Sequence, residues 1–120
     1  MDLLKDVAER AQRYLEAIAR RRVFPAPAAL QDLERFSIPL QEEPLAPAAV
    51  LAELDAIGSP ATVASTGGRY FGFVTGATLP AARAANMLAA AWDQNAGLEL
   101  NSPVGAYLER VCRDWLVELL

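Results

Sequence analysis

The chain has 120 residues, 53% of them apolar, and a formal net charge of −4, so one domain with a buried core is the first expectation. The negative charge disfavours a general nucleic-acid binder, which needs a positive field over the phosphates. A single cysteine allows no internal disulfide. No uncharged run approaches the ~20 residues that cross a bilayer, and the acidic N-terminal stretch lacks a signal-peptide pattern. We therefore expect a cytoplasmic protein with no nucleic-acid or membrane partner.

The first predicted helix covers residues 2–22. Asp2 can cap its start, and the prolines at 25 and 27 stop it. Apolar residues recur at alternating steps of three and four, as they do along one face of a helix: Leu4, Val7, Ala11, Tyr14 and Ile18. The basic run Arg20–Arg22 has two interpretations. It is either a solvated helix end that complements the helix dipole, or a contact for phosphate or an acidic lipid.

A proline-punctuated connector follows over residues 23–46, with a short helix predicted from about Pro27 to Arg35. Its apolar, proline-rich character suits either an arm that wraps over a partner surface or a long loop on the same domain. A second helix is predicted from Pro47 to Ile57, because a proline suits the first turn of a helix and Gly58 is a typical C-terminal stop.

The second half of the chain carries the most informative sequence features. In the segment YFGFVTG, residues 70–76, aromatic residues crowd against glycines, which permit positive φ and close approach of the backbone to another group. A long helix is predicted from about Pro80 to Ala96 and a last one from Pro103, capped by Asn101 or Ser102. The last helix has a wide apolar stripe: Leu108, Val111, Cys112, Trp115, Leu116 and Leu119. The sequence ends on this stripe as though a following element were missing.

Few residues of the chain suit catalysis. There is no histidine to act as a general base. Lys5 lies on the polar side of the first helix, without the desolvated pocket that a Schiff-base lysine needs, and Cys112 is predicted to be a small core residue. The polar cluster after the long helix lacks the histidines or paired carboxylates of a metal site: Asp93, Gln94, Asn95 and Asn101. We therefore predict no catalytic residue and no metal ligand in this chain.

The glycine-rich segment has one weaker functional interpretation. Its glycines match neither the dinucleotide fingerprint nor the P-loop: Gly67, Gly68, Gly72 and Gly76. Backbone N–H groups near Thr75 and Gly76, just ahead of a helix, could receive an anion such as a carboxylate. A plain turn is the alternative.

An ordered set of short motifs extends from Arg69 to Leu120. The motifs are Phe71-Gly72-Phe73-Val74, Leu79-Pro80, Ala90-Ala91-Trp92, Gln94-Asn95, Ser102-Pro103, Glu109 and Trp115-Leu116. In this order they strongly resemble the start of the group II pyridoxal-phosphate-dependent amino-acid decarboxylases, a family that includes aromatic-L-amino-acid and glutamate decarboxylases. Residues 1–65 are more loosely similar to the N-terminal helical extension of that family.

The resemblance implies a fold and a division of the chain. The family has a large aspartate-aminotransferase-like α/β domain of the type I pyridoxal-phosphate (PLP) enzymes. This chain would be the all-helical segment that precedes it, with three or four helices and a proline-rich arm. Residues 1–65 would form the arm that lies across the partner subunit of a homodimer. Residues 66–120 would begin the decarboxylase domain and stop before the PLP-binding part.

The resemblance also implies an activity. The parent enzyme would remove the α-carboxylate of an L-amino acid as carbon dioxide and leave an amine, with PLP as cofactor. The cofactor lysine and the histidine that stacks on its ring cannot be assigned here, so we expect this chain alone to be inactive and without bound cofactor. The implied substrate-binding residues would contact the substrate and its carboxylate or, across the dimer, line the side-chain pocket: Phe73, Thr75, Gly76, Asn95, Gly97 and Leu98.

A second interpretation is a stand-alone helical module for protein interaction or dimerisation, whose apolar helix faces mark a partner groove. The two interpretations differ in what the DNA encodes beyond codon 120. A continuing frame with a large domain that bears lysine and histidine favours the decarboxylase, and a stop codon favours the module.

Overall fold

The computed structural model describes residues 2–120 and contains, over that range, five α-helices, three short turns of 3-10 or π-helix, and no strand. The all-helical prediction is confirmed, with five α-helices in place of three or four. The chain divides into two compact units, Met1–Ala77 and Thr78–Leu120. The predicted boundary between residues 65 and 66 is of another kind, because it divides an arm from the start of a catalytic domain. It stays a prediction. Between residues 2 and 120, no helix combines the length and apolar character needed to cross a bilayer.

The first unit begins with α1 (Leu3–Ala17), and the predicted cap is confirmed. Asp2 Oδ1 accepts hydrogen bonds from the backbone N–H groups of Leu4 and Lys5, at 3.0 and 3.4 Å, which satisfies donors that a helix start leaves free. The helix ends earlier than the predicted residue 22. The chain turns after Ala17, whose carbonyl accepts from the N–H groups of both Arg20 and Arg21.

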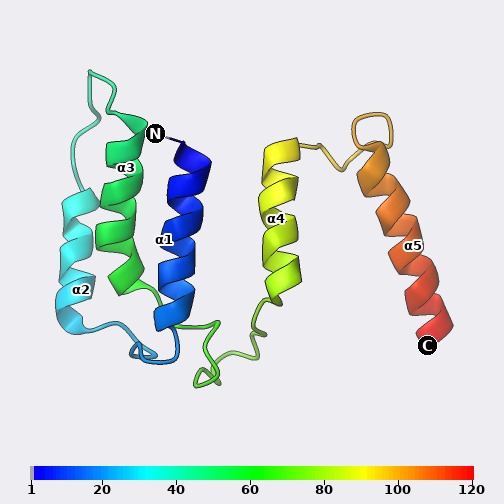
Figure 1. Cartoon of the computed structure of the whole chain (residues 1–120), viewed down its shortest axis with the longest axis horizontal. Coiled ribbons are helices and arrows are strands. Elements are labelled where there is room, and N and C mark those ends of the chain that lie inside the picture. Colours follow the sequence, from blue (N-terminus) through cyan, green and yellow to red (C-terminus); the bar gives the residue numbers. More distant parts are fainter. Residues whose placement is uncertain (1) are drawn as a thin grey trace. The chain divides into compact units, whose positions relative to one another are not determined.

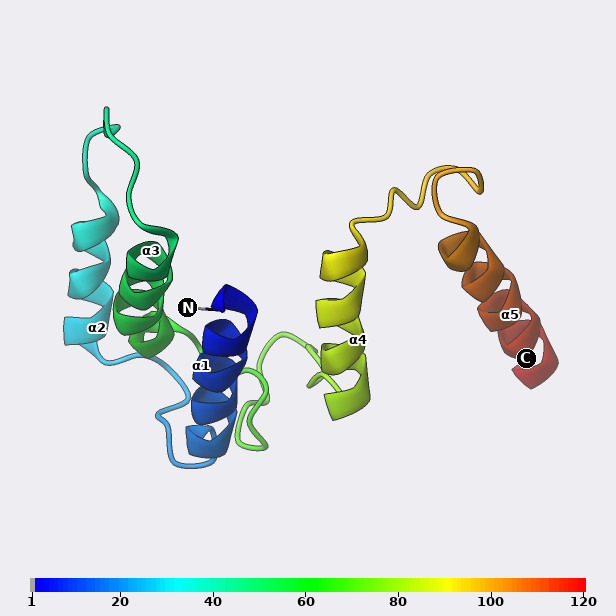
Figure 2. The same cartoon turned by 45° about the horizontal axis from the view of Figure 1, so that its top comes forward.

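Two further α-helices and three short turns complete the helical part of this unit. The predicted short helix is α2 (Pro27–Gln31), extended by the 3-10 turn η1 (Asp32–Phe36). The predicted helix over residues 47–57 is α3 (Pro47–Glu53), which continues as the π turn η2 (Leu54–Gly58) and the 3-10 turn η3 (Ser59–Ala61). Figures 1 and 2 both show α3 lying between α1 and α2.

The core of the first unit is small and includes one residue of η2, Ile57, and one residue of the segment after η3, Ala64. Ile57 is 1% exposed and Ala64 is 3% exposed. The N–H of Ala64 donates to the carbonyl of Val23 at 2.9 Å. A Cβ placed on Gly67 would lie 3.2 Å from the Ala64 carbonyl oxygen and 3.3 Å from Ile18 Cγ1, so a side chain at this position would need these neighbours to shift slightly.

The second unit contains α4 (Pro80–Trp92) and α5 (Pro103–Leu119), and neither helix buries a residue. Helix α4 ends at Asp93, in the left-handed region with φ 48°, and not at the predicted Ala96. A short polar residue tolerates this conformation better than most. Of the two residues predicted as possible caps of the last helix, Asn101 and Ser102, the cap is Ser102: its Oγ accepts from the N–H of Gly105 at 3.2 Å, and it is 2% exposed.

Candidate substrate-facing site

The predicted substrate-binding residues lie in both units. Phe73, Thr75 and Gly76 belong to the first unit, and Asn95, Gly97 and Leu98 belong to the second.

The first group lies on an exposed loop, residues 71–77, that follows the small core. Phe73 is 92% exposed and its neighbour Val74 is fully exposed. Both the N–H and the hydroxyl of Thr75 point back to the carbonyl of Gly72, at 3.4 Å each. The Thr75 N–H therefore already has an acceptor, so its availability to an anion depends on release of this turn.

Positive φ occurs on different residues from those that the sequence indicated. Within the described chain no glycine has positive φ, whereas Phe73 and Val74 have φ values of 54° and 55°. A bulky or β-branched side chain is strained in this region, at a cost on the order of 1–3 kcal/mol for each residue. Gly72 has a different role, because a Cβ there would lie 2.9 Å from the Tyr70 hydroxyl. A side chain at residue 72 would therefore force the end of the Tyr70 side chain to move.

The second group forms a tight polar turn between α4 and α5. Asn95 Oδ1 accepts from the N–H of Gly97 at 2.9 Å, and a Cβ on Gly97 would lie 3.1 Å from the same oxygen. The Leu98 carbonyl accepts from the N–H groups of Asn101 and Ser102, while the Leu98 side chain is 63% exposed. The Asn95 carbonyl oxygen thus shapes the turn, and its amide nitrogen is the end that faces away from this contact.

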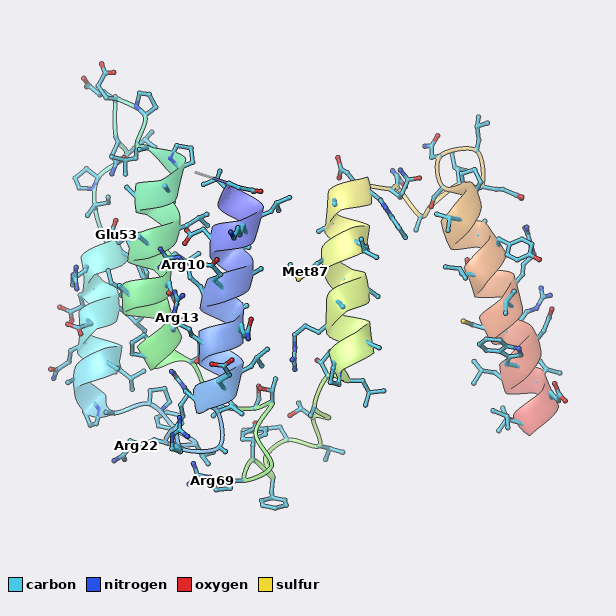
Figure 3. All side chains as sticks on the ribbon, in the orientation of Figure 1. Arg10, Arg13, Arg22, Glu53, Arg69 and Met87 are labelled. Carbon is cyan, nitrogen blue, oxygen red and sulfur yellow. The ribbon has the colours of Figure 1, made fainter. Side chains whose placement is uncertain are left out.

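A partly buried ionic network, which the sequence did not predict, joins α1 to η2. Arg10 donates to Asp6 at 3.1 Å and to Asp55 at 3.0 Å, and Ser59 Oγ donates to the other oxygen of Asp55 at 2.6 Å. Figure 3 shows Arg10 and Arg13 on α1, on the side that faces α3. The Ser59 hydrogen bond, followed by Arg10, lowers the pKa of Asp55 below its ordinary value of 3.8. Only the spacing of Asp6 and Arg10, four residues apart on one helix, was a sequence signal for any part of it.

The described residues do not fit a PLP site. The only lysine, Lys5, lies exposed on the first turns of α1, whereas a Schiff-base lysine needs a desolvated pocket. The sequence has no histidine to stack on the ring. Nor do residues 2–120 contain a group of three or more side chains that could hold a metal ion.

Two further features lie away from the predicted site. Cys112 is exposed on α5, so the prediction that it is a core residue is wrong. In the apolar stripe to which it belongs, Val111 is partly buried and the other residues are exposed. In the first unit, an open hollow is lined by the loop Ile38–Pro44 alone and includes none of the predicted residues.

Comparison of the chain with protein-family models, with curated proteins and with solved structures gave no match.

Proposed function

We propose that this chain is the N-terminal segment of a PLP-dependent L-amino-acid decarboxylase, in which it supplies substrate-facing residues and part of a homodimer interface. The ordered motifs between Phe71 and Leu116 support the family. The amount of apolar surface that the chain leaves exposed supports its role as part of a larger assembly, and this observation carries the proposal.

The exposed area is too large for a self-sufficient folded monomer. The described chain exposes 9841 Å², whereas a folded monomer of 12.9 kDa exposes about 6,300 Å². A contact between the two units of about 1,500 Å², large for an interdomain interface, would still leave an excess on the order of 2,000 Å². That excess is the area of an obligate subunit interface.

The excess is concentrated on apolar side chains that a monomer rarely leaves in water. On α5, Trp115, Leu116 and Leu119 are 62%, 59% and 81% exposed, and on α4 Trp92 is 51% exposed. The loop adds Phe71 and Phe73, each 92% exposed. These surfaces fit a large catalytic domain and a partner subunit, which in this proposal cover them.

The predicted residues have chemical roles in this setting. Phe73 would pack on the substrate, and the Thr75 hydroxyl with the Gly76 backbone would receive its carboxylate once the turn at Gly72 opens. Asn95, Gly97 and Leu98 would shape the pocket for the substrate side chain from across the dimer. Because the Asn95 oxygen is engaged with Gly97, its amide N–H groups are the donors that would face a polar substrate.

The cofactor would belong to polypeptide other than these 120 residues, since Lys5 does not fit it. PLP supplies the electron sink that decarboxylation of an amino acid requires. The part of this chain would be to bind, orient and enclose the substrate.

A direct assay tests the proposal. The purified chain, mixed with PLP and a panel of L-amino acids, should release no carbon dioxide beyond the free-cofactor background. The DNA beyond codon 120 should continue into a large domain that carries lysine and histidine. Turnover by the 120 residues alone would refute the proposed division of labour.

The alternative, a stand-alone interaction module, is favoured by one observation. The first unit has its own ionic network between α1 and η2, with Arg10 and Asp55 separated by 45 residues in sequence, so it has tertiary contacts without a catalytic domain. In this case the exposed face of α5 would receive a partner helix. A stop codon at position 121 would favour this alternative.

A further inference from the structure

The side chain of Arg21 joins α1 to a segment far along the chain. Its Nη2 donates to the main-chain carbonyl of Ser59 and lies 3.5 Å from Thr62 Oγ1. Its guanidinium carbon lies 4.5 Å from the centre of the Tyr14 ring, within the range of a cation–π contact. The Tyr14 hydroxyl is itself 2.8 Å from Thr62 Oγ1. One arginine therefore holds residues 59–62 against the end of α1.

The main chain next to Arg21 holds the following residues of the same segment. The Arg21 carbonyl accepts a hydrogen bond from Arg69 Nη2, and the Val23 carbonyl accepts from the N–H of the buried Ala64 at 2.9 Å. Figure 3 shows Arg22 and Arg69 at the same end of the first unit. The stretch from Ser59 to Arg69 is thus held at four positions by Arg21 and its near neighbour Val23.

The loop with the predicted substrate-facing residues begins directly after this held stretch. The N–H of Tyr70 donates to the Gly67 carbonyl at 3.1 Å. Beyond it, residues 71–77 form two hydrogen bonds, both from Thr75 to the Gly72 carbonyl. The direction in which the loop leaves the core is therefore determined at Arg69 and Tyr70.

We propose that Arg21 is a positioning residue that sets the path of residues 59–70 and so the placement of Phe73 and Thr75. The importance of these two residues for a substrate rests on the proposed function. An arginine suits this role because its planar group donates in two directions while it stacks on an aromatic ring, whereas a lysine offers a single point charge. The neighbouring Arg20 and Arg22 are exposed and provide matched controls.

Amide hydrogen exchange on the full 120-residue chain, read residue by residue by NMR, tests this proposal. In Arg21→Lys, exchange at Ala64 and Tyr70 should accelerate about tenfold, because charge-assisted hydrogen bonds to the segment are lost. Amides in the middle of α1 should accelerate less than about threefold. Arg20→Lys and Arg22→Lys should leave exchange at Ala64 and Tyr70 unchanged.

A second pair of variants keeps the test decisive if Arg21→Lys unfolds the first unit. Thr62→Val removes the hydroxyl that contacts Arg21 and Tyr14, and it should accelerate exchange at Ala64 about threefold. Thr62→Ser retains the hydroxyl and should restore the rate. The proposal is overturned if Arg21→Lys accelerates α1 and Ala64 equally, or if the valine and serine variants behave alike.

This experiment contains neither cofactor nor amino acid. Its failure would remove the positioning role of Arg21 and leave the decarboxylase proposal standing. Failure of the decarboxylase proposal in the carbon dioxide assay would in turn leave the exchange result intact.

Discussion

The two units of this protein are stabilised by different kinds of contact. The first unit buries Ile57 and Ala64 and joins residues 45 positions apart through Arg10 and Asp55. In the second unit no helix residue is buried, and the side-chain hydrogen bond that spans the most residues there joins Arg110 to Glu99, eleven positions apart. An isolated helix of 13 residues, the length of α4, is marginal in water, and most helical stability in proteins comes from tertiary packing of an apolar face. The second unit therefore has less internal packing to stabilise its helices than the first unit has.

The largest effect is expected in the core of the first unit. Ile57→Ala should lower the free energy of unfolding of that unit by about 3 kcal/mol, since it removes the most buried large side chain and leaves a cavity. Urea unfolding followed by amide exchange of α1 measures it. Leu54→Ala, on the same turn but 56% exposed, should cost less than about 1 kcal/mol. Equal costs would mean that the first unit has no specific core.

The second prediction concerns the exposed face of α5. The chain should self-associate as its concentration rises, because two copies can cover each other's apolar faces. Trp115→Ser should weaken the association about thirtyfold, or about 2 kcal/mol, as measured by light scattering. Val117 lies on a different side of α5, two residues away, so Val117→Ser should have little effect. A monomer at all concentrations would contradict this prediction.

The third prediction concerns pH and the ionic network of the first unit. The pKa of Asp55 is lower in the folded chain than its ordinary value of 3.8. The stability that it contributes is therefore fully present above that value and is lost as the pH falls through the lowered pKa. Asp55→Asn should cost about 1 kcal/mol at pH 7 and flatten the loss of stability below pH 4.

Thermal unfolding of the first unit, monitored over a pH series, measures this effect. Asp32→Asn changes an exposed carboxylate and is the control. If the Asp55 variant retained the acid sensitivity of the parent chain, another carboxylate would be responsible.

The smallest effect is expected in the exposed loop. Val74→Gly should stabilise the first unit by about 0.5 kcal/mol, because relief of the left-handed strain slightly exceeds the added freedom of the unfolded chain. Val74 makes no buried contact that would be lost. Thr75→Gly brings no such relief and should destabilise. The two opposite signs, read from urea midpoints, test whether the loop stores strain.

Helix identity could be predicted where the pattern is local. Asp2 was predicted as a cap, and Ser102 was one of two predicted candidates; both accept hydrogen bonds from N–H groups at the start of their helices, because a cap depends on residues only a few positions away. The end of α4 was predicted less well. Gly97 indicated that the helix ends near Ala96, but Asp93 adopts the left-handed conformation three residues earlier. Helix propensity does not distinguish between these two positions as the end of the helix.

The sequence by itself determined that the chain is helical, where its helices begin, and which helix faces are apolar, since these depend on spacing along 3.6-residue turns. The tertiary structure alone decided that Cys112 is exposed on α5 and that Arg21 reaches Ser59 and Thr62. It also decided that Arg10 is shared between two carboxylates. Contacts between residues about 40 positions apart depend on how the connecting turns bring them together, and no local pattern encodes that path.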